Sequence, residues 1–250
     1  MLTEKRFEEI VTLVDEKGTV TLQELKERLG TSESTIRRDL TALHNGGKLV
    51  KVFGGAVSLN TRYRTKDIEV LDRKDVNREE KQQIAKYAAA LIGPDDFVYL
   101  DAGTTTGYMI DFIQNRQATF VTNGVIHAQR LAAAGLHVIL IGGELKASTE
   151  AVVGSEAVVH LQRYHFTIGL WGTNGVHPTS GLSTPDNNEA MIKRIAMEQT
   201  RCPYVLCDHS KFGQISTVTF AELNRGVIIT DRVDNMQYRK LENVIALDKL

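Results

Sequence analysis

The sequence has little cysteine and no long apolar run, and each of these shortages excludes a class of protein. Its 250 residues include two cysteines and four prolines. Cys202 and Cys207 have four residues between them and no second pair, so they match neither a zinc spacing nor a disulfide framework. No apolar stretch is long enough to span a membrane, and the start "MLTEKRFEEIV" has acids where a secretion signal needs basic and then apolar residues. We therefore expect a cytoplasmic protein.

A strong net charge is also missing. The formal net charge is -1, with 42% hydrophobic and 24% charged residues, which is an ordinary globular composition and excludes a nonspecific polycation. The charge is unevenly distributed, however. Residues 1–33 hold five Lys/Arg against eight Asp/Glu, net -3, whereas residues 34–66 hold seven against one, net +6. The basic segment is either a binding surface for a polyanion or a solvated face balanced by the preceding acids.

Residues 1–57 predict a winged helix-turn-helix domain. Apolar residues at helical spacing predict a helix over roughly 3–17, and a second helix follows with Thr21 and Glu24 as its capping box. A third helix begins near Ser32 and ends at the glycine pair 46–47, and "KLVKVFGGAV" then has the pattern of a short β-ribbon. Three short helices, a tight turn between the second and third, and a hairpin are typical of this domain.

The stretch "SESTIRRDL" at the start of the third helix is the candidate DNA-binding surface. Ile36, Leu40 and Leu43 share one face, which leaves the polar side chains on the opposite surface. Hydroxyl groups and helix N-termini bind phosphate oxygens, and arginine clamps phosphate or bridges guanine. The alternative is a small helical bundle whose surface is basic for other reasons. The predicted DNA-contacting residues are Ser32, Ser34, Thr35, Arg37, Arg38 and, in the wing, Lys51.

These residues also carry a family resemblance. The pattern "S-x-x-T-I-R-R-D-L" from Ser32, followed by "G-x-L-x-K-x-x-G-G-A" from Gly47, resembles the N-terminal signature of DeoR-type bacterial transcriptional repressors. The likeness covers nearly the whole chain. It implies a winged helix joined to a sugar-phosphate-sensing domain similar in fold to ribose-5-phosphate isomerase. It also implies a homo-oligomer that binds a double-stranded DNA operator.

The part of the sequence after the winged helix predicts a polar linker and a second domain. Residues 58–77 are polar and charged, and we interpret them as the linker. From residue 78 to residue 250, the apolar runs "FVYLD", "ATFVT", "HVILIGG", "FTIGLWG", "YVLCD" and "GVIITD" alternate with helical patterns. Such alternation predicts an α/β domain with a mostly parallel sheet.

Glycine and polar residues follow several of these strands, where parallel sheets bind ligands. In "DAGTTTG", small residues, hydroxyls and a helix start form either an anion cradle or an ordinary capped turn. The lysine of a P-loop and the spacing of a dinucleotide fingerprint are missing, so we predict neither ATP nor NAD and no cofactor. Lys211 is a compact cation that suits a phosphate, although a solvated lysine is the alternative. The resemblance implies an effector pocket built from Asp101, Gly103, Thr104, Thr105, Thr106, Asn123, Gly142, Gly143, Asn174, Glu189, Lys193 and Lys211.

The resemblance also bears on which sugar is bound. The stretches "GVHPTSGLSTPDNNEAMIKR" and "DHSKFGQIS" look most like the fructose-operon branch, which implies fructose 1-phosphate. Tagatose 6-phosphate or another hexose phosphate remains open, because hydroxyl stereochemistry is read by details that one sequence does not show.

We predict no catalytic residue and no metal ligand. Many relatives have "G-x-D-G" where this chain has Thr173-Asn174-Gly175, and an asparagine cannot act as a general base. The alternative, a sugar-phosphate isomerase with an accessory DNA-binding module, would have to use Asp101, Glu144 or Glu189. The seven histidines show no HExxH or paired Cys/His arrangement, so we interpret them as surface or core residues.

Overall fold

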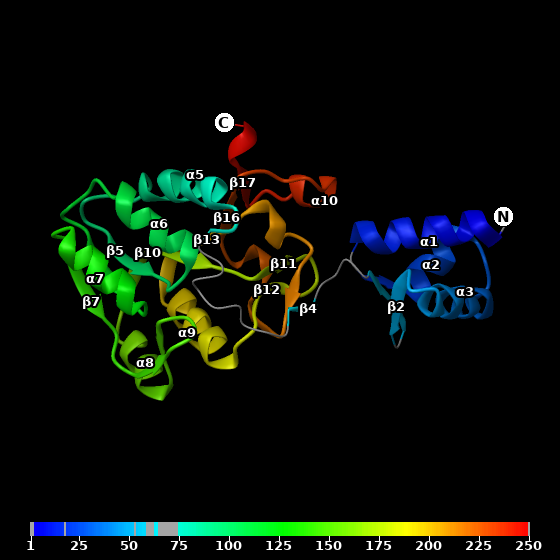
Figure 1. Cartoon of the computed structure of the whole chain (residues 1–250), viewed down its shortest axis with the longest axis horizontal. Coiled ribbons are helices and arrows are strands. Elements are labelled where there is room, and N and C mark those ends of the chain that lie inside the picture. Colours follow the sequence, from blue (N-terminus) through cyan, green and yellow to red (C-terminus); the bar gives the residue numbers. More distant parts are fainter. Residues whose placement is uncertain (1–2, 18, 53, 59–62, 65–74, 250) are drawn as a thin grey trace. The chain divides into compact units, whose positions relative to one another are not determined.

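The computed structural model describes residues 3–17, 19–52, 54–58, 63–64 and 75–249 (Figure 1). The chain divides into two units, Met1–Tyr63 and Arg64–Leu250, and each is described by itself. Most of the predicted linker, 58–77, lies outside the described residues.

The first unit has the elements of a winged helix-turn-helix. They are α1 (Thr3–Lys17), β1 (Thr19–Thr21), α2 (Leu22–Leu29), α3 (Glu33–Asn45), β2 (Leu49–Val52) and β3 (Gly55–Ser58). The three strands form an antiparallel sheet in the order β1-β3-β2. Ile10, Leu25, Ile36 and Leu40 are fully buried between the helices and this sheet. The three predicted helices and the ribbon are confirmed, whereas β1 was not predicted.

Local signals define the ends of α2 and α3. Thr21 accepts a hydrogen bond from the backbone N–H of Glu24, whose carboxylate accepts one from the N–H of Thr21, so the predicted capping box is present. Gly30 ends α2 in the left-handed conformation, with φ of 58°. Ser32 then caps α3 by accepting from the N–H of Thr35. The turn between the two helices is therefore built from a glycine and a serine.

The second unit contains a seven-stranded parallel sheet in the order β17-β16-β13-β10-β5-β6-β7. Its strands are β5 (Phe97–Leu100), β6 (Thr119–Thr122), β7 (His137–Leu140), β10 (Phe166–Gly172), β13 (Thr200–Leu206), β16 (Val227–Thr230) and β17 (Val244–Ala246). The six predicted runs form six of these strands, and the parallel α/β fold is confirmed. The edge strand β17 was missed because its three half-buried residues give too short a pattern.

Helices cover both faces of this sheet (Figure 1). They are α5 (Arg78–Ala89), α6 (Thr104–Met109), α7 (Val125–Ala133), α8 (Ser155–Leu161), α9 (Asn187–Glu198) and α10 (Met236–Arg239). Alternate residues of β5 enter different cores. Val98 and Leu100 pack with α5 and α6, and Tyr99 packs with α8 and α9. Burial on both faces explains why the strands are continuous apolar runs.

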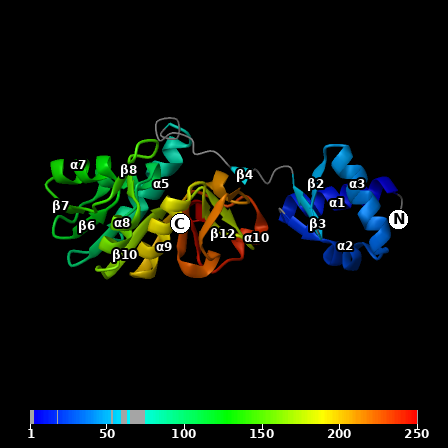
Figure 2. The same cartoon turned by 90° about the horizontal axis from the view of Figure 1, so that it is seen from below.

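Shorter elements extend the face that α9 covers. They include the hairpin of β8 (Glu144–Lys146) and β9 (Ala151–Val153), and a small antiparallel sheet of β11 (Gly175–His177), β12 (Gly181–Thr184) and β15 (Val218–Ala221). Figure 2 shows β12 beside α9, in agreement with the contacts between them. The remaining elements are β4 (Tyr63–Arg64), η1 (Ile110–Phe112), η2 (His209–Lys211), β14 (Ile215–Ser216), η3 (Leu223–Arg225) and η4 (Leu247–Lys249).

The strand order reverses between β5 and β10. From β5 the chain moves outward through β6 and β7, and then returns to the other side of β5 for β10, β13, β16 and β17. Loops on either side of such a reversal diverge and leave a crevice at the carboxyl ends of the strands. The fold therefore predicts a ligand site above β5 and β10.

Candidate functional site

A cavity of about 150 Å³ lies at this reversal point. The loops after β5, β10 and β13 contribute to it, together with α9 and the start of α5. Eight of the predicted effector residues line the cavity: Asp101, Gly103, Thr104, Thr105, Asn174, Glu189, Lys193 and Lys211. Residues up to 110 positions apart in the sequence thus meet at one edge of the sheet, as the strand-end pattern predicts.

A buried ion pair forms part of the cavity wall. Lys193 from α9 contacts Oδ2 of Asp101, which follows β5 directly, and the two residues are 5% and 1% exposed. The backbone of Gly172, at the end of β10, joins the pair. Its N–H donates to Oδ2 of Asp101 over 3.0 Å, and its carbonyl accepts from Nζ of Lys193 over 3.1 Å. The pair therefore links β5, β10 and α9.

Burial shifts the ionisation of the Asp101 carboxyl. Loss of solvation raises the pKa of Asp101, and the neighbouring Lys193 and the N–H of Gly172 oppose that rise without cancelling it. Glu189 adds a smaller contribution in the raising direction. An anionic ligand beside Lys193 would compete with Asp101 for the same ammonium group.

Glu189 lines the cavity but is held from the other side. Its Oε1 accepts from the hydroxyl of Thr149 over 2.6 Å and from Nζ of Lys146 over 3.0 Å. Lys146 also lies 3.3 Å from Asp186, the N-cap of α9. These contacts fix the first turn of α9 against the β8–β9 hairpin. Glu189 therefore lines the cavity with a carboxylate that is already hydrogen-bonded on its other side.

Lys211 is oriented by the loop that follows β13. Its Nζ lies 3.6 Å from Oδ2 of Asp208 and 3.2 Å from the hydroxyl of Ser210, which also lines the cavity. Burial alone would raise the pKa of Asp208, but Lys211 and hydrogen bonds from Ser210 and Asn77 outweigh burial, so the pKa is lowered. Asp208 is therefore ionised at neutral pH and keeps the ammonium group of Lys211 at the cavity.

Four predicted effector residues lie outside the cavity lining. Thr106 donates to the carbonyls of Asp101 and Gly103, which shapes the loop behind the cavity. Asn123 accepts from the N–H of Ala102 over 2.8 Å. The N–H of Gly142 donates to His160. At Gly143, a Cβ would lie 2.6 Å from the carbonyl of Val153, so this glycine lets the β8–β9 hairpin pack closely.

Sequence reasoning missed several residues that line the cavity, of which Lys81 is the most informative. Lys81 is only 4% exposed, although it belongs to a helix with many solvated charges. It lies on the same helical face as Ile84, Ala85 and Ala88, which are fully buried. Lys81 precedes these three core residues by three, four and seven positions, which is the spacing of one helical face, so the sequence already indicated that it points inward. The other missed lining residues are Val76, Ala102, Gly172, Thr173, Leu206, Cys207 and Ser210.

The predicted DNA-contacting residues gather at the start of α3 and in the wing. The hydroxyl of Ser32 lies 2.9 Å from those of both Ser34 and Thr35. Arg37 and Arg38 are exposed, and Arg37 donates two hydrogen bonds to Oε1 of Glu33. In the wing, Lys51 on β2 donates to the hydroxyl of Thr41 on α3 over 2.7 Å, so wing and helix form one polar surface.

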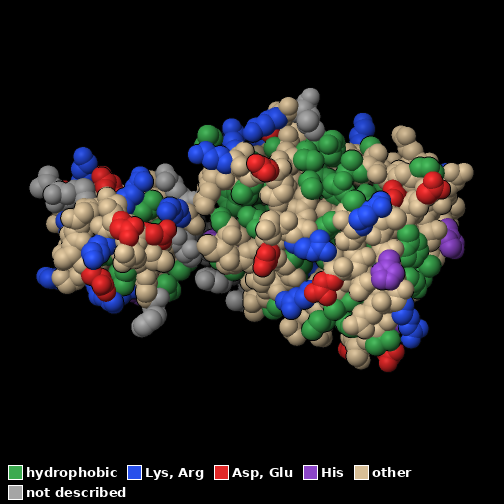
Figure 3. Space-filling model, turned by 180° about the vertical axis from the view of Figure 1, so that it is seen from behind, with side chains coloured by type: hydrophobic (Ala, Val, Ile, Leu, Met, Phe, Trp, Pro, Cys, Tyr) green, Lys and Arg blue, Asp and Glu red, His purple; other side chains and the backbone are tan. Residues whose placement is uncertain are grey.

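One contact holds the inner side of this surface in place. Arg6 of α1 forms two hydrogen bonds with the buried Asp39, which anchors the inner side of α3. On the face in Figure 3, basic and acidic side chains are interspersed over each unit.

The fold and cavity define the class: a winged helix-turn-helix unit followed by a parallel α/β domain with a polar cavity at its strand-order reversal. Residues 6–62 match the model of the DeoR-like helix-turn-helix domain, and residues 76–232 match that of the DeoR C terminal sensor domain. The chain belongs to the DeoR family.

Curated relatives match over almost the full length. The chain is 40% identical over 239 residues to an uncharacterized HTH-type transcriptional regulator FruR of Bacillus subtilis (strain 168), covering 95% of this chain and 94% of the relative. It is 32% identical over 247 residues to the lactose phosphotransferase system repressor of Staphylococcus aureus (strain NCTC 8325 / PS 47), covering 97% and 98%. Both relatives are named as regulators of transcription.

Solved structures match more distantly. Ribose 5-phosphate isomerase a from Methanocaldococcus jannaschii is 17% identical with a TM-score of 0.42, over 54% of this chain and 55% of that one. The sorbitol operon regulator SorC from Klebsiella pneumoniae is 13% identical with a TM-score of 0.39, over 84% and 91%. Within the described residues, none of the helices has the length and apolar character that crossing a membrane requires.

Proposed function

We propose that this protein is a transcriptional repressor of a sugar-utilisation operon, and that a phosphorylated sugar bound in the sensor cavity controls its affinity for the operator. Fructose 1-phosphate is the first candidate for the effector. The observation that carries the proposal is the cavity at the strand-order reversal, which Lys193 and Lys211 line together with Gly103, Thr104 and Thr105 of the loop after β5.

The DNA-binding part of the proposal rests on the start of α3. In helix-turn-helix domains, the N-terminal residues of the second helix of the motif contact base edges in the major groove. Here that position holds three hydroxyl groups and the exposed pair Arg37 and Arg38. We assign phosphate binding to Ser32, Ser34 and Thr35, base or phosphate contacts to the two arginines, and a backbone contact to Lys51.

The effector part of the proposal rests on the chemistry of the cavity. Lysine ammonium groups and hydroxyls bind phosphate oxygens, while carboxylate and amide oxygens accept hydrogen bonds from sugar hydroxyls. Lys211 and Thr104 supply the first kind of group, and Asp101 and Asn174 the second. The resemblance of the stretches after β10 and β13 to the fructose-operon branch favours a fructose derivative, and tagatose 6-phosphate and other hexose phosphates stay in the comparison. The Staphylococcus aureus relative is named a lactose phosphotransferase system repressor, so a sugar system other than fructose is represented among the relatives.

An isomerase function is less well supported. It needs a carboxylate free to move a proton beside a carbonyl group. Asp101 already binds Lys193 and the N–H of Gly172, and Glu189 already binds Thr149 and Lys146. The third candidate, Glu144, does not line the cavity. Asn174 stands where a carboxylate would be needed. We therefore propose a binding function for the cavity, with no catalytic residue.

A screen of phosphorylated sugars tests the proposal. The melting temperature of the purified protein is measured with fructose 1-phosphate, fructose 6-phosphate, tagatose 6-phosphate and unphosphorylated fructose. A true effector raises it by mass action and, in a gel shift on the promoter beside the gene, releases the DNA. Lys211→Ala should weaken effector binding about tenfold, the loss expected for one charge-assisted hydrogen bond, and leave operator binding without sugar unchanged.

The control is Lys86→Ala, which removes an exposed lysine from the same domain and should change neither property. An equal loss of sugar and operator binding in Lys211→Ala would contradict the division into two modules. If no sugar phosphate in the panel raises the melting temperature, the effector proposal fails and the DNA-binding proposal stands on the gel shift alone.

A further inference from the structure

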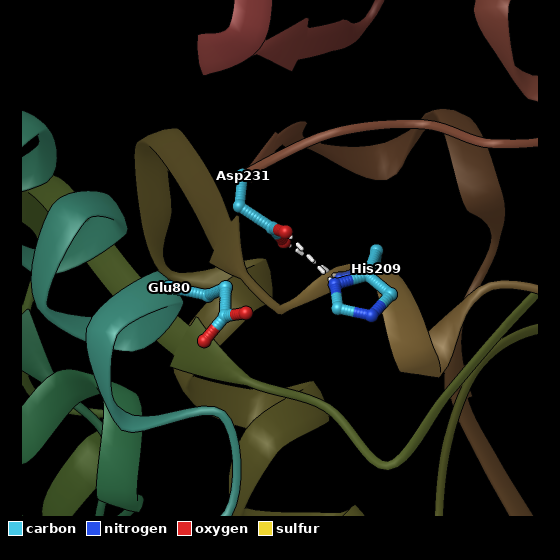
Figure 4. Close-up of side chains that lie close together, drawn as sticks. All are labelled: Glu80, His209 and Asp231. Atoms are coloured by element: carbon cyan, nitrogen blue, oxygen red, sulfur yellow. Dashed lines mark hydrogen bonds and ion pairs between the residues drawn. The ribbon is translucent and has the colours of Figure 1, made fainter.

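Beside the sensor cavity, three side chains from different parts of the chain point toward a common space (Figure 4). Glu80 comes from the first turn of α5, His209 begins η2, and Asp231 follows β16 directly. One donor atom from each lies within 4.8 Å of the other two. None of these three side chains lines the effector cavity or belongs to the proposed DNA-binding surface.

His209 and Asp231 form the fixed part of this cluster. Nδ1 of His209 lies 2.8 Å from Oδ2 of Asp231, and the backbone N–H of His209 donates to Oδ1 over 2.7 Å. The Asp231 side chain is 5% exposed and that of His209 19%. The imidazole therefore presents Nδ1, rather than Nε2, to the carboxylate groups.

Glu80 is the unexplained member of the cluster. It is half-buried, and no other residue in the described ranges forms a hydrogen bond or ion pair with its carboxylate. A partly exposed carboxylate in this position keeps both oxygens available as acceptors for a cation. The partner that the geometry offers is a cation shared with His209 and Asp231.

We propose that Glu80, His209 and Asp231 bind one divalent transition-metal ion, with Zn²⁺ as the reference ion. One imidazole nitrogen and two carboxylate oxygens are a donor set that suits zinc, whereas Mg²⁺ and Ca²⁺ take oxygen ligands. Ligand atoms at zinc distances lie about 3.4 Å apart around a tetrahedral ion. Zinc binding would require the His209–Asp231 contact to widen from 2.8 Å and the three ligand atoms, now within 4.8 Å of one another, to adjust to this spacing.

Arg232 is the competing cation at this place. Its Nη1 lies 3.2 Å from Oδ2 of Asp231, and its side chain is 42% exposed. An exposed arginine can turn into solvent when a metal ion takes over the carboxylate oxygen. Arg232 therefore weakens the site without blocking it, and its removal should strengthen metal binding.

The position of the site connects it with the cavity. Glu80 is followed by Lys81, and His209 is followed by Ser210 and Lys211, and these three neighbours line the cavity. An ion that ties α5 to η2 would hold two walls of the cavity together. If the proposed effector function is correct, metal and effector should each strengthen the binding of the other, since such coupling is reciprocal.

Isothermal titration of the EDTA-treated full chain with ZnCl₂, and separately with MgCl₂, tests the metal site. We expect one Zn²⁺ per chain and weak or no binding of Mg²⁺. Glu80→Gln should weaken Zn²⁺ binding by about tenfold or more, as should His209→Gln. Glu79→Gln is the matched control, because Glu79 is the exposed neighbour on the same helical turn.

Two outcomes would overturn the metal site: no Zn²⁺ binding by the unchanged chain, or equal binding by Glu80→Gln, His209→Gln and Glu79→Gln. Circular dichroism of each variant establishes that it is folded, and the pair of ligand variants keeps the test valid if one of them is not. Because no sugar is added, failure here leaves the effector proposal untouched. A titration repeated with the sugar phosphate then tests the coupling separately.

Discussion

The winged helix and the sensor domain place their candidate functional residues in opposite ways. In the winged helix, the six predicted DNA-contacting residues lie between Ser32 and Lys51, and the two arginines among them are exposed. In the sensor domain, the cavity residues extend from Val76 to Lys211, and the central pair Asp101 and Lys193 is 1% and 5% exposed. Exposed charged side chains contribute little to the free energy of unfolding, whereas a buried charge destabilises the fold unless it is paired. Binding and stability are therefore separable in the first unit and coupled in the second.

The sharpest test of this contrast is Lys193→Met. It leaves the buried carboxyl of Asp101 without its cation, which should destabilise the sensor domain by about 3–5 kcal/mol. Urea unfolding followed by tryptophan fluorescence measures this, because the single tryptophan, Trp171, is buried in the sensor domain. The double variant Asp101→Asn/Lys193→Met should recover much of the loss. Equal destabilisation in the single and double variants would show that the ion pair is not its source.

A second test uses pH. Burial lowers the pKa of His127 to about 4, and Arg130 acts in the same direction, while the carbonyl of Gly103 opposes both. An unfolded histidine has a pKa near 6.5, so between pH 6.5 and 4 the unfolded chain binds a proton that the folded chain does not. Acidification through this window should therefore destabilise the sensor domain by about 2–3 kcal/mol.

The His127 contribution is isolated by substitution. In His127→Gln, the free energy of unfolding should fall less steeply over the same pH window than in the unchanged chain. Identical slopes in the two proteins would assign the acid sensitivity to other groups.

For the winged helix, Arg37→Ala should affect binding without affecting folding. Loss of one arginine contact to a base or phosphate weakens DNA binding by about 1–3 kcal/mol. The guanidinium is exposed, so the melting temperature and sugar binding should stay unchanged. Fluorescence anisotropy with a labelled operator measures the affinity. A comparable loss of thermal stability would remove the contrast between the two units.

The smallest expected effect is that of Ser32→Ala. This change removes the N-cap of α3 and should destabilise the winged helix by about 1 kcal/mol. It also removes a proposed phosphate contact, so DNA binding should weaken as well. Ser34→Ala removes a neighbouring hydroxyl but not the cap and should leave stability unchanged, as thermal unfolding of the two variants side by side would reveal.

Much of the fold could be predicted because its signals are local. The capping box of Thr21 and Glu24, the glycine at the end of α2 and the continuous apolar strands each depend on neighbours in the sequence. The small sheet of β11, β12 and β15 was not predicted: β11 and β12 are short, glycine-containing strands of a local hairpin, and β12 pairs with β15 over about 35 positions. Local patterns do not specify the long-range β12–β15 pairing.

The candidate site was predictable to the extent that strand ends identify it. Asp101, Asn174 and Lys211 follow strands directly or closely, and the parallel sheet brings them together. Lys81 was missed because it belongs to a helix whose neighbouring charges are solvated. Gly142 and Gly143 also follow a strand, but at the far side of the sheet, and only the strand order separates them from the cavity.

The salt bridge between Glu33 and Arg37 bears on how a repressor of this kind would distinguish its operator from other DNA. Glu33 carries a negative charge at the helix end proposed to approach DNA, and it occupies the guanidinium of Arg37 at 2.6 Å. This pair is exposed and worth only about 0.3–0.5 kcal/mol, so DNA can displace Glu33 at small cost, but contacts to the Nε side of Arg37 must offset that cost. A well-placed base or phosphate offsets it more fully than a poorly placed one, so the acid adds a small increment to the discrimination between DNA sites.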